Sequence, residues 1–281
     1  MRSQSEKIAL AECIKIFTSS YDAYYESYTL TNEAIAELIN VDSEKFIAEY
    51  NTRVNAAQLY SSKIDFTSEK DSYFFSKGNL SILQKQKILV LGTRRASSQG
   101  KKEVLSIVKA IGEADSALVV SLEQGISLFA LSCAVKFKVP VIVVLANPFN
   151  AIKKELSLEV INQLDGENIL FLSPFYMFEK VEAWSKLIRN RNLENISDKL
   201  FIAEELDGGP SWTSCDYFIS NSKDVCVPDD FYTNPNLSFS KKLVEDDIIY
   251  TYKTDKEILS FIKGTRRSKS TKAKKTKVKL I

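Results

Sequence analysis

Histidine is absent from all 281 residues of this chain, and the absence bears on every enzyme class that depends on an imidazole. Imidazole is the usual base of serine and cysteine hydrolases and the commonest metal ligand. Any catalysis would therefore have to use carboxylates or lysine. Several enzyme classes are thus removed from consideration.

Cysteine is also scarce, and its spacing excludes two kinds of covalent scaffold. The four residues, Cys13, Cys133, Cys215 and Cys226, lie far apart and form no Cys-x-x-Cys pair. Closely spaced cysteine pairs are typical of zinc sites and of disulfide frameworks. We therefore expect no metal site, and we interpret the four thiols as core fillers.

Long hydrophobic runs are missing as well. The longest, Val139 to Ala146, is far shorter than the ~20 apolar residues that span a bilayer. The N-terminal stretch MRSQSEKIAL has no apolar core of a signal peptide. Because 44% of the residues are hydrophobic, the chain can still form one full-sized domain and a smaller one. We expect a folded cytoplasmic protein with no membrane contact.

Acidic residues are missing from the C-terminal end of the chain. Nine of the 38 basic residues, and none of the 36 acidic ones, lie between Lys263 and Lys279, so residues 1–262 carry a net negative charge. A low-complexity segment of this charge density is typical of a disordered arm. We predict a basic flexible tail over residues 263–281 that acts as a non-specific electrostatic anchor for polyanions.

Residues 1–75 show helical periodicity without strand signals. Within them, Thr29–Tyr50 looks like two short helices around a break at Asn40–Ser43. DNA-reading helix-turn-helix units share that shape with plain helical hairpins, but this segment has few of the basic residues that major-groove binding needs. We expect a small N-terminal helical region that does not itself read DNA.

Residues 76–262 alternate short apolar runs with helical patterns. We predict strands at 88–91, 117–121, 141–146, 169–172, 200–203, 225–227 and 248–252, and helices at 101–111, 126–137 and 151–164. The alternation is typical of a parallel sheet with right-handed crossovers, a doubly wound α/β domain. Ligands of such sheets bind at the carboxyl ends of the strands, so residues 92–100, 121–125 and 147–150 should line one crevice.

The turn after the first of these strands reads GTRRASSQG, from Gly92 to Gly100, and leads into a helix. A helix N-terminus offers unpaired backbone N–H groups and a positive dipole end, and Arg94 and Arg95 add charge in a fork geometry that suits phosphate. The turn is neither a dinucleotide-binding GxGxxG nor a Walker loop. We expect a phosphate-bearing ligand here. The alternative is an ordinary βα turn whose arginines are merely solvated.

Five short motifs, in order and at plausible spacing, make the chain resemble the DNA-processing protein A family (DprA or Smf) over about residues 73–262. They read FSKGNL (75–80), GTRRASSQGK (92–101), RNRNLENISD (189–198), GGPSWT (208–213) and SKDVCVP (222–228). One segment departs from the family. Its SGLARGID appears as SLEQGIS (121–127), in which an arginine is replaced by Gln124 and Glu123 is gained.

The resemblance implies an extended Rossmann-like domain that binds single-stranded DNA, forms a homodimer and helps to load the RecA recombinase, with no catalysis and no cofactor. It places DNA phosphates at Gly92, Arg94, Arg95, Ser97, Gly100, Lys101, Arg189, Asn190 and Arg191. Aromatic faces for base stacking could come from Phe175, Tyr176, Phe178 and Trp184, although buried core packing is the alternative for these rings.

Two other functions stay open. A nucleotide-binding enzyme or sensor on a related fold, such as a phosphoribohydrolase, would use the two basic loops to grip one nucleotide. The Pro-Gly-Gly-x-Gly-Thr loop of those proteins is only approached by Gly208 to Ser211. A degenerate scaffold that keeps the fold but has lost DNA binding would fit the altered 121–127 segment.

Overall fold

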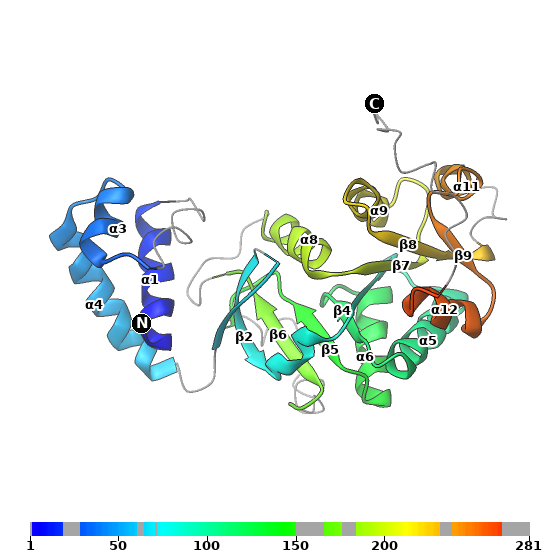
Figure 1. Ribbon diagram of the computed structural model, residues 1–281, viewed down its shortest axis with the longest axis horizontal. Helices are drawn as coiled ribbons and strands as arrows, with labels where there is room; N and C mark the ends of the chain where they lie inside the picture. Colours follow the sequence, from blue (N-terminus) through cyan, green and yellow to red (C-terminus); the bar gives the residue numbers. More distant parts are fainter. Residues whose placement is uncertain are drawn as a thin grey trace.

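The computed structural model describes residues 2–18, 29–60, 65–70, 72–149, 166–175, 184–230 and 238–265. Over these ranges a nine-stranded sheet has the order β1-β2-β6-β5-β4-β3-β7-β8-β9 (Figure 1). The strands are β1 (Asp65–Glu69), β2 (Ser72–Gly78), β3 (Lys87–Gly92), β4 (Ala117–Val120), β5 (Val141–Val144), β6 (Ile169–Ser173), β7 (Lys199–Glu204), β8 (Asp224–Pro228) and β9 (Tyr250–Tyr252). From β6 to β9 every pairing is parallel, and the β1–β2 hairpin adds antiparallel to β6. The predicted mostly parallel α/β sheet is confirmed.

The strand sequences are apolar because both faces of the sheet are covered. Successive side chains of a strand point to opposite faces. In β3, Ile88 and Val90 enter one core, whereas Leu89 enters the other. The two cores form on the two faces of one sheet, as a doubly wound fold requires.

Helices cover the two faces in two layers (Figure 1). One face carries α5 (Ser98–Glu113), α6 (Ile126–Phe137) and α12 (Asp255–Ile262); the other carries η1 (Leu80–Gln84), α8 (Ser185–Ile196), α9 (Ser211–Ser220) and α11 (Ser238–Glu245). The helix expected over 151–164 lies outside the described residues, and so does the tail from residue 266. Among the described helices, none is both long enough and apolar enough to cross a bilayer.

The N-terminal helices form a lobe beside the hairpin end of the sheet (Figure 1). They are α1 (Gln4–Phe17), α3 (Asn32–Leu38) and α4 (Ser43–Tyr60). The break between α3 and α4 contains Asn40 at φ 55°, a left-handed conformation that asparagine tolerates. The two helices expected around this break are therefore present, and α4 runs ten residues beyond the expected Tyr50.

The structure corrects the expectation that residues 1–75 contain no strand. The strand β1 and the first half of β2 lie in that stretch. β1 reads DFTSE and occupies the outermost position of the sheet, so its composition carries little of the apolar signal that marks the central strands.

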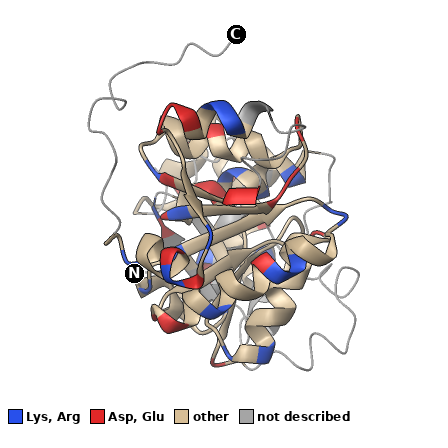
Figure 2. Ribbon diagram, turned by 90° about the vertical axis from the view of Figure 1, so that its right-hand side faces the viewer, with Lys and Arg blue, Asp and Glu red and all other residues tan. Residues whose placement is uncertain are grey.

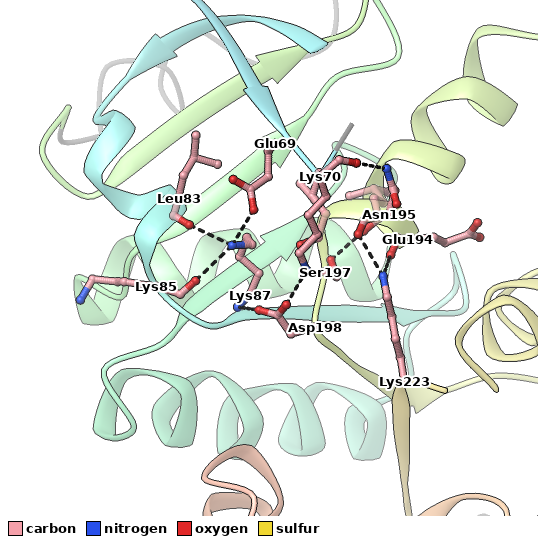
Figure 3. Close-up of polar contacts among 12 residues, drawn as sticks. Glu69, Lys70, Leu83, Lys85, Lys87, Glu194, Asn195, Ser197, Asp198 and Lys223 are labelled. Carbon is pink, nitrogen blue, oxygen red and sulfur yellow. Dashed lines mark hydrogen bonds and ion pairs between the residues drawn. The ribbon is translucent and has the colours of Figure 1, made fainter. Parts of the chain in front are cut away.

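The turn of this hairpin reaches the starts of β3 and β7 and is held there by lysines (Figure 3). The buried Lys87 Nζ lies 2.9 Å from Glu69 Oε1 and donates to the Leu83 carbonyl at 2.8 Å. Lys70 Nζ donates to Asp198 and to the Ile196 carbonyl. We call Lys70, Lys87 and Lys223, with their oxygen partners, the lysine network.

The four cysteines are buried and free, as the interpretation of core fillers requires. Burial raises the pKa of the Cys133 thiol, and nearby lysines oppose that shift only in part. Their burial and this shift fit a packing role, because thiols in apolar surroundings are inert.

Candidate nucleic-acid interface

Two turns at the carboxyl ends of β3 and β4 are held in backbone contact. Gly125 has φ 85°, and a Cβ there would lie 2.6 Å from the Cα of Arg94. The Ile126 N–H donates to the Thr93 carbonyl at 3.1 Å. Only a glycine allows this approach, so the local sequence fixes the turn that carries Arg94 against the turn that carries Glu123.

A cavity of ≈ 40 Å³ opens at this junction and is completed by α8 and the start of α9. Its lining residues are Leu91, Gly92, Arg94, Ser121, Glu123, Gln124, Ser127, Arg189, Asn190, Leu193, Pro210, Ser211 and Ser214. Two of the three segments expected to share one crevice therefore do so. The third, 147–150, does not contribute to this lining through its described residues: Asn147 is buried and accepts a hydrogen bond from Ser173 through its carbonyl.

Glu123 is the one acidic side chain among the described residues that line this cavity, and cations surround it. Its Oε1 lies 3.1 Å from Arg94 Nη2, 3.1 Å from Arg189 Nη2 and 4.0 Å from Lys186 Nζ. Burial by itself raises the pKa of Glu123, but the charges of Arg189, Arg94 and Lys186 outweigh it and hold that pKa below its usual range. The carboxylate is ionised at neutral pH, and three positive charges share it.

The three cations differ in their access to solvent. The side chains of Arg94 and Lys186 are each 62% exposed, whereas that of Arg189 is 5% exposed. Arg189 also donates from Nε and Nη2 to Asn190 Oδ1. Arg94 and Lys186 can therefore meet a ligand directly, while Arg189 lies beneath Glu123. We call Arg94, Glu123, Lys186 and Arg189 the arginine site.

The predicted residues Arg95, Lys101 and Arg191 are exposed but do not line this cavity. Lys101 lies on α5, with its Nζ 5.8 Å from the centre of the Phe129 ring. Arg191 is two residues beyond Arg189 on α8, and residues two apart on a helix point to different sides. These cations can extend a basic surface, but they do not converge on the arginine site.

Ser97 and Gly100 lie outside the arginine site, at the N-terminus of α5. The anionic group at this helix end is the carboxylate of Glu204. Ser97 is the N-cap and accepts from the Gly100 N–H at 3.0 Å, while the Ser97 N–H donates to Glu204 Oε2 at 2.9 Å. For Ser97 and Gly100, this corrects the expectation of unpaired N–H groups at the turn. A carboxylate at a helix N-terminus is favoured for the same reasons as a phosphate.

The glycines of the turn are explained by packing within the chain. A Cβ on Gly92 would lie 2.5 Å from the Glu204 carbonyl oxygen, and one on Gly100 would collide with the Glu204 carboxylate. The adjoining cavity, of ≈ 170 Å³, is lined by four acidic residues, Glu103, Glu204, Glu205 and Asp230. Such a lining repels a phosphate, so the basic cavity is the better candidate for a nucleic-acid contact.

The four candidate stacking rings are divided by the structure. Phe175 is 1% exposed and belongs to the core. Trp184, just before α8, is 39% exposed, and its ring centre lies 6.3 Å from that of Phe175. Leu187 nearby is 70% exposed. Tyr176 and Phe178 lie outside the described residues.

The site residues that the prediction left out come mostly from pairings distant in sequence. Lys186 stood in the same basic cluster as Arg189 and could have been included on that signal. Ser211 and Ser214 donate to the carboxylates of Glu205 and Glu194, both at 2.6 Å, so their hydroxyl hydrogens point away from the cavity. These two hydroxyls are therefore not the donors that an anion in the cavity would meet.

Away from the arginine site, one side of the described part of the chain carries charges of both signs. Viewed from the β9 end, acidic and basic segments are interspersed along the ribbon (Figure 2). At the arginine site, by contrast, three cations face one carboxylate, so the local charge is positive.

Comparisons with known proteins agree with the fold. A family model described as DNA recombination-mediator protein A matches residues 51–263. The DNA processing protein DprA of Bacillus subtilis (strain 168) is 28% identical over 131 residues, which cover 46% of this chain and 44% of that protein. The match thus spans less than half the length of this curated relative.

Two solved structures are similar in fold. DNA processing protein A (DprA) from Streptococcus pneumoniae gives a TM-score of 0.65 at 18% identity and covers 92% of this chain and 98% of its own. DNA processing protein A from Helicobacter pylori, studied for its single-stranded DNA binding mode, gives a TM-score of 0.58 at 17% identity, with 69% and 88% covered. At these identities the likeness establishes the fold.

Proposed function

This chain belongs to the DNA recombination-mediator protein A family, and on that basis we propose that it binds single-stranded DNA at the arginine site. The observation that carries the proposal is the convergence of Arg94, Lys186 and Arg189 on the Glu123 carboxylate, which lines the cavity at the carboxyl ends of β3 and β4. Ligands of doubly wound sheets bind at this end of the strands. The single-stranded DNA binding mode of the Helicobacter relative supports the same ligand.

The contact would combine phosphates with bases. Single-strand binding needs cations that follow the backbone and exposed flat surfaces on which bases stack. Arg94 and Lys186 supply exposed charge, and Trp184 and Leu187 supply apolar surface at the start of α8. Arg95, Lys101 and Arg191 would extend the path of the backbone. The helix pair α3 and α4, whose shape resembles a helix-turn-helix, has few basic residues, so we expect single strands to be preferred over duplex.

The family also supplies the proposed partners and role. We propose that the protein acts as a recombination mediator that assists RecA loading, works as a homodimer and converts no substrate chemically. The basic tail beyond residue 264 would raise the local concentration of DNA without selecting single strands. Light scattering tests the dimer, and the rate of RecA filament assembly on a coated strand tests the mediator role.

A titration of labelled single-stranded DNA, duplex DNA and a mononucleotide at several salt concentrations tests the binding proposal. We expect the single strand to bind most tightly, with a log–log salt slope of about −0.7 per neutralised phosphate. Equal affinity for single strand and duplex would contradict the proposal. Preference for the mononucleotide would favour a nucleotide enzyme or sensor, and no binding at all would favour a scaffold.

A further inference from the structure

We propose that Glu123 is a built-in competitor of the ligand: its carboxylate occupies the place at Arg94 and Arg189 that a phosphate group takes on binding. The proposal deepens the proposed function and rests on it. It makes Glu123 an affinity-setting residue, so that a strand binds only by displacing a side chain of the protein itself.

The burial of Arg189 supports this assignment. A guanidinium that is 5% exposed needs an anionic partner, and Glu123 Oε1 at 3.1 Å is the acidic group that the described residues place beside it. The Glu123 side chain is itself 27% exposed, so it lies between Arg189 and solvent. If this side chain swings out, the path from solvent to the buried guanidinium opens.

The surrounding charge favours replacement by a phosphate. Arg94, Lys186 and Arg189 place three positive charges around a single negative one. Lys186 and Arg189 also lie in the first turns of α8, where the helix dipole adds to the positive potential. A phosphate diester has the same charge as a carboxylate but brings the binding energy of the rest of the strand with it.

The backbone of Glu123 is held by hydrogen bonds, whereas its side chain is held by ion pairs. The Glu123 N–H donates to Ser121 Oγ at 3.3 Å, and its carbonyl accepts from the Leu128 N–H at 3.0 Å. The second bond ties Glu123 to the first turn of α6, and neither bond involves the carboxylate, which is held by ion pairs, two of them to cations that are 62% exposed. Displacement therefore requires side-chain rotation and no change in the fold.

The test uses three variants of the full chain. Glu123→Gln keeps the shape and removes the charge, Glu123→Ala empties the place, and Glu113→Gln makes the same change in net charge at an exposed position at the far end of α5. Melting temperatures are measured in inorganic phosphate and in chloride at matched ionic strength. Affinity for labelled single-stranded DNA is measured in parallel.

We expect phosphate, relative to chloride, to raise the melting temperature of Glu123→Ala by several degrees, because the ion restores a partner to Arg189. The parent and Glu113→Gln should show no phosphate-specific rise. Glu123→Gln should bind single-stranded DNA about tenfold more tightly than the parent, because a carboxylate no longer faces the incoming phosphate. Glu113→Gln should bind like the parent.

The two measurements separate the failure of this inference from the failure of the proposed function. If the parent binds single-stranded DNA and Glu123→Gln binds no more tightly, the competitor is disproved and the function stands. If neither binds DNA but phosphate specifically stabilises Glu123→Ala, the anion site stands and the function fails. If Glu123→Ala does not fold, Glu123→Gln takes its place in the phosphate measurement, and an equal response in both salts overturns the inference.

Discussion

The two ends of helix α8 treat basic residues in opposite ways. At its C-terminus, Lys223 Nζ donates to the carbonyls of Glu194 and Asn195 at 2.8 and 2.9 Å, and Lys70 donates to the next carbonyl (Figure 3). At its N-terminal half, Arg94, Lys186 and Arg189 share one carboxylate. The number of nearby acceptor oxygens decides the role of a cation. Where carbonyls are plentiful the cation stabilises the fold, and where they are few it can still bind a ligand.

Backbone direction explains this difference. The last carbonyls of a helix lack partners inside it and attract cations, so lysines of the network fit there. Helix N-termini attract anions instead, and the chain places Glu204 at α5 and Glu205 at α9 for that purpose. The cations at the carboxyl ends of the strands are thereby left with Glu123 alone among the acidic residues lining their cavity. An external anion can neutralise the positive charge that Glu123 leaves over.

The largest expected effect is on stability, in the lysine network. Replacing Lys87 with methionine removes the partner of Glu69, and their side chains are only 7% and 18% exposed. Breaking a buried ion pair from one side costs about 3 kcal/mol. We expect chemical denaturation to show a loss of this size, with DNA affinity unchanged.

A matched control is Lys85→Met, because its partner Asp115 is 87% exposed. Exposed pairs contribute about 1 kcal/mol or less. Equal losses of unfolding free energy in the two variants would mean that burial does not determine how much these lysines stabilise the fold.

Replacing Arg189 should lower both stability and DNA affinity, since this residue lies in the arginine site but is buried like Lys87. Arg189→Ala leaves Glu123 without its most buried partner, and we expect unfolding free energy to fall by about 2 kcal/mol. Affinity should fall as well, because a phosphate loses the same guanidinium. A soluble variant of parental stability would show that the pair adds nothing to the fold.

Replacing Arg94 and Arg95 should lower DNA affinity and leave stability nearly unchanged. The double alanine variant loses exposed charge, so stability should change by less than about 1 kcal/mol. Affinity for single-stranded DNA should fall about tenfold, and the log–log salt slope should shrink by about 1.4 if both contact phosphates. Replacing two lysines of the tail should cost less. Parental affinity in the double variant would identify GTRRASSQG as a structural turn.

The central strands and the Arg94 turn could be predicted because their signals are local. Apolar runs of four to six residues ending at glycine or at a polar turn identify β3 to β7. The hairpin of β1 and β2 escaped detection because an outer polar strand has no such run. The partner of the Arg94 turn could not be predicted either, because Glu204 is 107 residues away from Ser97 in the sequence. The contact forms where the pairing of β3 with β7 shifts register at Gly92. The RNRNLENISD motif singles out Arg189, but it does not say that the side chain faces Glu123.

The smallest effect concerns pH and returns to the lysine network. Burial, and then the charge of Lys70, lower the pKa of Lys223 to about 8. In the unfolded chain the pKa of lysine is about 10.4. Between these values the unfolded state binds more protons than the folded state, so the free energy of unfolding rises with pH across that window.

The Lys223→Met variant lacks this titration, so the parent should gain stability relative to the variant as the pH rises from about 8 to about 10. Lys223 is only half buried, and screening by solvent should limit the gain to about 1 kcal/mol. Denaturation curves at pH 7, 8.5 and 10 measure it. Removing the charge of Lys70 with Lys70→Met should raise the pKa of Lys223 and move the gain to higher pH. A parent-minus-variant difference that is flat with pH would mean that Lys223 keeps its proton throughout, held by the two carbonyls at the end of α8.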